Sequence, residues 1–334
     1  MGIFSKSKKD ENYDIKKSIF DEIKKHDSII ILRHYRPDGD AIGSAFGLKY
    51  ILEASFPEKH IYCVGDGMPS YLSFVGVEDE VSDDIIQNSL IIVVDTATSE
   101  RIATDTYQKN SKVIKIDHHI ATENYGYINL VYEDAPACCQ IIYEFFDTFK
   151  DSLKMTKDAA LALYTGLVTD TGRFKYSSIT EESFNCAGKL ISYNIDTDKL
   201  YSYLNNKAPE SFKLQGYVYQ NFKITENGVA YIYISKKLMK KFRTNENDAA
   251  NLVNCLDSIK GSLIWLLFIE YDTEIRIRFR SRYIPVVDIA SEFGGGGHAN
   301  AAGGKISKKK DYIKVLDCAD KKLKAFKLEH KELF

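Results

Sequence analysis

Short apolar runs, rich in β-branched residues, recur through the first half of the chain. They are Ser28 to His34, His60 to Val64, Leu90 to Asp95 and Lys112 to Asp117. Because they do not alternate with polar residues, they predict strands buried on both faces, as in a parallel sheet wrapped by helices. Helical periodicity covers Tyr13 to Lys25, Ala137 to Phe149, Lys157 to Thr169 and Glu181 to Tyr193. The pattern predicts an α/β fold with a doubly wound, mainly parallel sheet.

The second half of the chain alternates instead. Val229 to Ser235 and Glu274 to Arg282 have a period of two residues, and Ser262 to Glu270 adds a further apolar run. This pattern predicts a smaller α+β C-terminal domain. We expect domains at residues 1–204 and 216–334, joined by a linker or hinge at 205–215, with a cleft between them.

The composition limits the classes of protein to which the chain can belong. Its 334 residues suffice for two domains, and 44% hydrophobic with 28% charged residues is typical of a globular protein. The net charge of -2 gives no field that would draw the chain onto long duplex DNA or an anionic membrane. The six cysteines contain no CxxC pair, which favours a reducing cytoplasm. A homodimer is left open.

Acidic residues and histidines gather at the ends of the predicted strands. They are His34, Asp38, Asp40, Asp95, Asp117, His118, His119 and Asp170. Each of these residues also has a plainer interpretation when taken singly. The aspartates of the RPDGD turn and Asp95 could be helix caps, and His118 and His119 could be a packed pair. Together they point to one crevice beyond the carboxyl ends of the strands. If four of these carboxylates and two of the imidazoles converge there, they require cations, and two divalent ions would balance the charge.

Mixed imidazole and carboxylate ligands without thiolate favour Mn²⁺, with Mg²⁺ or Co²⁺ as substitutes. An aspartate that bridges two ions would hold a water between them and lower its pKa. The arrangement is typical of a hydrolase acting at phosphorus.

Two features of the C-terminal half are candidates for phosphate binding. Arg276, Arg278, Arg280 and Arg282 alternate with other residues, so in a strand their guanidinium groups share one face. A solvated face that protects a sheet edge is the competing interpretation. The run Gly294 to Gly297 leaves the backbone free to direct N–H groups at an anion. Alternatively it is a flexible loop, although His298 and the small residues after it favour a close-packed turn.

The motifs His34-x-x-x-Asp38-x-Asp40, Asp95, Asp117-His118-His119 and Asp170 in DTGRF resemble the DHH phosphoesterase superfamily. That resemblance implies one metal ion on His34, Asp38 and Asp95. It implies a second ion on Asp40, Asp95, His118 and Asp170. Asp117 would orient an imidazole, His119 would face the phosphate, and Asp95, Asp117 and His119 would be the catalytic group.

The segment GGGGHANAAG, Gly294 to Gly303, is similar to the DHH-associated domain of the nanoRNase and pAp phosphatase branch. The resemblance implies that this domain holds the substrate, with Arg280 binding phosphate. The implied substrate-binding residues are Arg280, Ser281, Gly295, Gly296, Gly297 and His298.

The expected activity is that of a manganese-dependent phosphohydrolase with two Mn²⁺ ions. Its substrates would be short RNA oligonucleotides and adenine nucleotides: nanoRNA and pApA cleaved exonucleolytically to mononucleotides, and pAp dephosphorylated to AMP. A stand-alone cyclic-di-AMP phosphodiesterase is the alternative enzyme, and a nucleotide-binding regulatory module the non-enzyme alternative. A manganese pyrophosphatase would carry an SRKKQ-type signature, which the chain lacks.

Overall fold

The computed structural model describes residues 8–109, 112–176, 178–206 and 208–331. The chain divides into two compact units between residues 206 and 207. Most of the linker expected at 205–215 is helical, because helix α8 begins at Pro209. The domain limits expected from sequence remain a prediction, and residues 1–7, 207 and 332–334, which they include, lie outside the described residues.

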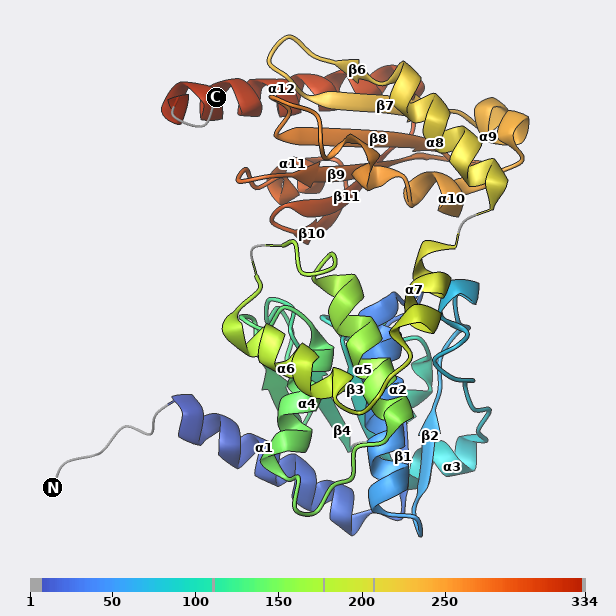
Figure 1. The fold of residues 1–334 in the computed structure, drawn as a ribbon, viewed down its shortest axis with the longest axis vertical. Helices are drawn as coiled ribbons and strands as arrows, with labels where there is room; N and C mark the ends of the chain where they lie inside the picture. The colour runs from blue at the N-terminus through green and yellow to red at the C-terminus, as the bar shows by residue number, and fades with distance from the viewer. Residues whose placement is uncertain (1–7, 110–111, 177, 207, 332–334) are drawn as a thin grey trace, which may run out of the picture. The chain divides into compact units, whose positions relative to one another are not determined.

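The first unit contains one sheet and seven α-helices within the described residues (Figure 1). Its strands are β1 (Ser28–Leu32), β2 (His60–Cys63), β3 (Leu90–Val94), β4 (Val113–Asp117) and β5 (Ile128–Val131). Its helices are α1 (Lys8–Lys25), α2 (Gly39–Ser55), α3 (Asp83–Asn88), α4 (Cys138–Thr148), α5 (Lys157–Asp170), α6 (Glu181–Ile191) and α7 (Thr197–Asn205).

The strands of this sheet are all parallel, in the order β2-β1-β3-β4-β5. Alternate residues of β1 enter different cores: Ile29 and Ile31 pack with α1, α2, α4 and α5, whereas Ile30 packs with Ile86 of α3. Burial on both faces explains why the strands are apolar throughout. The predicted doubly wound parallel sheet is confirmed, with β5 as a strand that the sequence pattern did not indicate.

The second unit is a six-stranded mixed sheet with helices. Its strands are β6 (Lys223–Ile224), β7 (Ala230–Ile234), β8 (Ile264–Glu270), β9 (Ile275–Ser281), β10 (Gly296–His298) and β11 (Ala301–Ile306). Its helices are α8 (Pro209–Asn221), α9 (Lys236–Phe242), α10 (Glu246–Ala250), α11 (Val287–Glu292) and α12 (Tyr312–Glu329). The strand order is β10-β11-β9-β8-β7-β6, and only β7 and β8 run parallel. The predicted α+β C-terminal domain is confirmed.

The two faces of the second sheet are covered differently. One face packs α11 and α12 against residues such as Leu266 and Phe279, and α12 lies along it in Figure 1. On the other face, α8, α9 and α10 cover β7 and β8 through a core that includes Trp265 and Leu267. No residue of β9, β10 or β11 belongs to that second core. This half of the face carries the arginine stripe.

Candidate active site

The order of the parallel strands places the predicted metal ligands at one edge of the first sheet. His34 follows β1, Asp95 follows β3 directly and Asp117 ends β4. These three strands are neighbours. Because carboxyl ends of parallel strands meet at the same edge, residues far apart in sequence lie together. Asp95 has a φ of 49°, a left-handed conformation that aspartate tolerates better than most residues.

Close packing of α2 against α5 brings two further aspartates to the site, Asp40 at the start of α2 and Asp170 at the end of α5. A Cβ at Gly43 would lie 2.5 Å from the Ala162 carbonyl oxygen. A Cβ at Gly166 would lie 2.9 Å from Oδ1 of Asp40. Glycine at both positions therefore permits the approach of the helices that places the two carboxylates. Figure 1 shows α2 and α5 side by side.

The side chains form groups with the spacing of metal ligands. Nε2 of His34 lies 4.0 Å from Oδ1 of Asp38 and 3.7 Å from Oδ2 of Asp95. Nε2 of His118 lies 3.8 Å from Oδ2 of Asp40, 3.4 Å from Oδ1 of Asp95 and 3.5 Å from Oδ2 of Asp170. Atoms that each lie about 2.1 Å from one ion are about 3 to 4 Å apart.

Three such groups occur among the described residues. They are His34 with Asp38 and Asp95, Asp40 with His118 and Asp170, and Asp95 with His118 and His119. Asp95 contacts both imidazoles that the sequence assigned to different ions. The structure thus brings all six predicted metal ligands together.

The two imidazoles are held with Nε2 facing the carboxylates. Nδ1 of His34 lies 2.9 Å from the carbonyl oxygen of Tyr35, and Nδ1 of His118 lies 3.1 Å from that of Ala135. A ring that donates Nδ1–H to a carbonyl keeps the lone pair of Nε2 for a metal ion. Backbone oxygens therefore fix the tautomer that metal binding requires.

Asp38 and Asp40 each cap a helix as well as facing an imidazole. Oδ1 of Asp38 accepts from the amides of Asp40 and Ala41 at the start of α2. Asp40 accepts from the amides of Cys138 at 2.6 Å and Cys139 at 2.9 Å, the first two residues of α4. The capping interpretation is thus compatible with a metal-binding role. Sequence reasoning missed the α4 amides; the available signal was Ala137, which precedes the helix without a capping side chain.

The electrostatics of the cluster favour a bound cation. Burial, and then the charge of Asp95, raises the pKa of Asp40 to about 7. Burial also raises the pKa of Asp170. Burial would lower the pKa of His118, but its aspartate neighbours outweigh that effect and raise it. Conversely, burial would raise the pKa of Asp95, but the imidazoles of His118 and His34 lower it.

Oδ1 of Asp95 is buried and accepts no hydrogen bond. A buried carboxylate oxygen without a donor is unfavourable unless a cation faces it. The donor set therefore fits the divalent ions that the sequence predicted.

Asp117 and His119 form a pair beside these groups. Asp117 is fully buried, and its Oδ1 accepts from Nδ1 of His119 at 2.8 Å and from the amide of His118 at 2.9 Å. The His119 side chain is 20% exposed. Asp117 belongs to none of the three ligand groups. Its contacts suit a residue that orients an imidazole.

The predicted substrate-binding residues of the second unit lie on a ribbon of three strands. The glycine run forms strand β10 at Gly296–His298, paired with β11, where a turn was expected; the turn lies at Ala299 and Asn300. A Cβ at Gly295 would lie 1.8 Å from the carbonyl oxygen of Gly303. Because the two backbones approach so closely, glycine is required there.

Directly opposed residues of antiparallel strands share a face, so the register forms two rows across this ribbon. Arg280, Ala301 and His298 make one row. Arg278, Gly303 and Gly296 make the other. The three arginines of β9 are half-buried and alternate with buried residues, as the stripe predicted.

Two of the predicted substrate-binding residues lie elsewhere. Ser281 belongs to the opposite face, where it is buried and its hydroxyl donates to the carbonyl oxygen of Ile284. Gly297 is paired with the buried Ala302. It therefore also belongs to the face opposite the two rows. We name the face that carries Arg276, Arg278, Arg280, Gly296, His298, Ala301 and Gly303 the arginine face.

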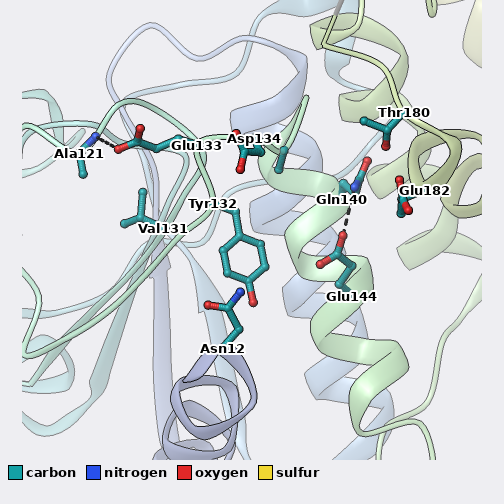
Figure 2. A pocket seen from close by; sticks show the side chains of 11 residues that line it. Asn12, Ala121, Val131, Tyr132, Glu133, Asp134, Gln140, Glu144, Thr180 and Glu182 are labelled. Carbon is teal, nitrogen blue, oxygen red and sulfur yellow. Dashed lines mark hydrogen bonds between the residues drawn. The ribbon is translucent and has the colours of Figure 1, made fainter. Parts of the chain in front are cut away.

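A pocket of about 540 Å³ in the first unit does not coincide with the ligand groups (Figure 2). Its walls are acidic: Glu133 accepts from the amide of Ala121, and Glu144 accepts from Nε2 of Gln140. None of its lining residues is a predicted metal ligand. The candidate site is thus identified by its side chains rather than by this pocket.

The chain matches two family models. Residues 28–167 match the N-terminal domain of the DHH family, and residues 226–325 match the DHHA1 domain. The first match contains the predicted ligands except Asp170, and the second contains the arginine face.

No helix of the described residues combines the length and apolar character needed to cross a bilayer.

Named relatives cover most of the chain. A Bacillus subtilis protein named bifunctional oligoribonuclease and PAP phosphatase NrnA is 39% identical over 87% of this chain and 93% of its own length. A Mycoplasma genitalium protein of the same name is 36% identical over 90% and 95%. An exopolyphosphatase-related protein from Bacteroides fragilis has a similar solved structure, with a TM-score of 0.84 and 27% identity over 95% of this chain and 98% of that one. The chain therefore belongs to the DHH phosphoesterase family.

Proposed function

We propose that this protein is a manganese-dependent phosphohydrolase that cleaves short RNA oligonucleotides, pApA included, and removes the 3'-phosphate from pAp. The observation that carries the proposal is the pair of ligand groups joined through Asp95. The names of the relatives, bifunctional oligoribonuclease and PAP phosphatase, support the substrate class. We further propose that it acts in the cytoplasm, where its six free cysteines would stay reduced.

Two divalent ions fit the residues of the first unit. His34, Asp38 and Asp95 would hold one ion, and Asp40, Asp95, His118 and Asp170 the other. Imidazole with carboxylate, and no thiolate, favours Mn²⁺. Such ions supply a nucleophilic hydroxide at neutral pH and stabilise charge on the phosphoryl oxygens.

The chain's own residues orient and protonate the substrate. Asp117 holds the His119 ring through Nδ1, which leaves Nε2 as the atom that faces the phosphate. A proton held on Nε2 can pass to the departing oxygen, and the carboxylate of Asp117 stabilises the ring while it is charged. Asp95, Asp117 and His119 thus remain the proposed catalytic group.

The arginine face is proposed to hold the rest of the nucleotide. Arg278 and Arg280 would bind phosphate, which suits the planar fork of a guanidinium group. Their neighbours across the strands, Gly303 and Ala301, are small, so a flat base can approach the backbone. Gly295, Gly296 and His298 are exposed at the edge of the same ribbon. Within the described residues, this face lacks the length of a cationic channel, which favours short substrates.

A panel of substrates tests the function. With Mn²⁺, we expect turnover of pAp, pApA and a pentamer RNA, and a kcat/KM that falls steeply towards a twenty-mer. Cyclic-di-AMP and pyrophosphate are the comparison substrates. Preference for either of these, or equal efficiency on dimers and twenty-mers, would contradict the proposal. Intact ligand groups without turnover of any substrate would favour a nucleotide-binding module.

A further inference from the structure

A lysine lies fully buried in the middle of the apolar strand β4. Lys115 has no exposed surface. Its ammonium group donates to the carbonyl oxygens of Ala97 at 2.9 Å and Glu123 at 3.0 Å, and its Nζ lies 3.2 Å from Oδ2 of Asp117. Two of the three donors of the ammonium group thus bind carbonyl oxygens, and the contact with Asp117 is an ion pair.

This position does not need a charge to complete the sheet. Val113, two residues earlier on the same face of β4, is buried in an ordinary apolar core. Burying an ammonium group is costly unless its partners compensate it. Lys115 has three close oxygen partners, so we expect its contribution to be the positioning of the groups that carry them.

Lys115, Asp117 and His119 form a continuous chain of contacts. Oδ2 of Asp117 faces Lys115, whereas Oδ1 accepts from Nδ1 of His119. Oδ2 accepts no hydrogen bond within the described residues, and its contact with the ammonium group at 3.2 Å is an ion pair. The ion pair with the ammonium group therefore holds Oδ2 of this carboxylate in place.

The same ammonium group joins the two loops that border the ligand groups. Ala97 lies two residues after Asp95, and Glu123 lies four residues after His119. The carboxylate of Glu123 also accepts from the amide and hydroxyl of Ser99, which ties the loops together a second time. Lys115 thus contacts both loops from beneath the site.

We infer that Lys115 is a positioning residue that holds Asp117, and through it the His119 ring, in the single orientation that the reaction requires. The inference rests on the proposed function for its kinetic part. The orientation of the ring can be measured without turnover, so failure of the proposed function would not hide failure of the inference.

The test compares Lys115→Met, Asp117→Leu and the double variant with the wild-type protein. Methionine keeps the length of the side chain and removes the charge. The double variant leaves no buried charge without a partner, so it remains informative if Lys115→Met folds poorly. Lys49→Met is the matched control, because Lys49 is also buried and paired at 2.5 Å, with Asp79.

The first readout is the ¹⁵N spectrum of the His119 ring in metal-free protein, assigned with His119→Gln. We expect one ring form in the wild type, with Nδ1 held by the carboxylate of Asp117. Without the ammonium group the carboxylate is no longer fixed, so Lys115→Met should show a second ring form. Lys49→Met should retain the wild-type spectrum.

The second readout is kinetic. Orienting partners of this kind are worth about 10- to 100-fold, so kcat should fall by that factor in Lys115→Met while KM stays within about twofold. If Lys115 acts through Asp117, the double variant should be no slower than Asp117→Leu. Losses that multiply, a kcat unaffected in folded Lys115→Met, or an unchanged ring spectrum would overturn the inference.

Discussion

The metal-ligand cluster of the first unit and the arginine face of the second are built by opposite means. In the cluster, Asp95, Asp40 and His118 are buried, and each is held by neighbours from other elements. On the arginine face, Arg280 is half-buried and its strand partners are small. Fixed geometry is needed where charge must be balanced at short range, whereas an open surface suits a ligand that enters and leaves.

The difference has an energetic reason. Buried carboxylates repel each other strongly unless hydrogen bonds and cations compensate them, so the cluster tolerates little change. The half-buried guanidinium groups of the arginine face are partly solvated, so we expect the loss of one to leave the fold intact. Substitutions in the two regions should therefore separate metal binding from substrate binding.

The largest expected effect is that of Asp95→Asn. Asparagine also tolerates the left-handed backbone, so the fold should survive while the carboxylate that both groups share loses its charge. We expect metal affinity to fall by more than about 100-fold, since even a residue that only orients a ligand is worth about 10- to 100-fold, and activity to fall with it. Elemental analysis and kcat check this. Asp151→Asn, at an exposed turn, should change neither, and full retention of metal in Asp95→Asn would refute the site.

Arg280→Ala should show the reverse behaviour. Loss of a charge-assisted phosphate contact costs about 1.5 to 3 kcal/mol, or about 10- to 100-fold in kcat/KM, chiefly through KM. Metal content should stay at the wild-type level. Arg276→Ala, on the same face, should have the smaller effect, because that guanidinium is engaged with Glu274 and Tyr271. Metal loss in Arg280→Ala would end the division of roles between the two regions.

Gly166→Ala tests how tightly the cluster depends on packing. The added Cβ would lie 2.2 Å from Sγ of Cys139, so α2, α4 and α5 must shift. We expect a loss of about 1 to 3 kcal/mol in the free energy of unfolding, with weaker metal binding because Asp40 moves. Gly188→Ala, where a Cβ meets no atom within 4 Å, should stabilise α6 by up to about 1 kcal/mol. Equal behaviour of the two variants in denaturant titrations would contradict the packing argument.

The smallest effect concerns protons. The pKa of Asp40 is raised to about 7, mainly by burial, so in metal-free protein near pH 7 this group holds a proton for part of the time. Metal binding needs the deprotonated form. Affinity should therefore rise as pH rises through 7, and metal binding should release protons, because the pKa values of Asp170 and His118 are raised as well. Calorimetry in two buffers of different ionisation enthalpy measures the release, and proton uptake would have the wrong sign.

The sequence pattern predicted much of the fold, with identifiable gaps. Uninterrupted apolar runs predicted β1 to β4 because burial on both faces selects such residues. The short strand β5 lies at the sheet edge, and three of its four residues are only partly buried, so it lacks that signal. The strand β10 was missed because glycine disfavours strands, and only the close approach of β11 makes glycine necessary there.

Some features of the candidate site could likewise be predicted from the sequence, and others could not. The motifs named all six candidate metal ligands, and strand order alone was enough to bring three of those segments to one edge. Alternation along β9 places Ser281 on the face opposite Arg280, although the motif had grouped the two residues. Lys115 was visible as a charged residue inside an apolar strand, but its partners Ala97 and Glu123 come from other segments.

By itself, the sequence determined the chemical types and the strand ends that carry them, because periodicity and motif spacing are local properties of the chain. Only the tertiary structure decided which oxygen faces which nitrogen. The amides of α4 on Asp40, the carbonyl oxygen of Ala97 on Lys115 and the fit of α2 against α5 are contacts between separate segments of the chain. They are set by how close two backbones can pack, which no local pattern records.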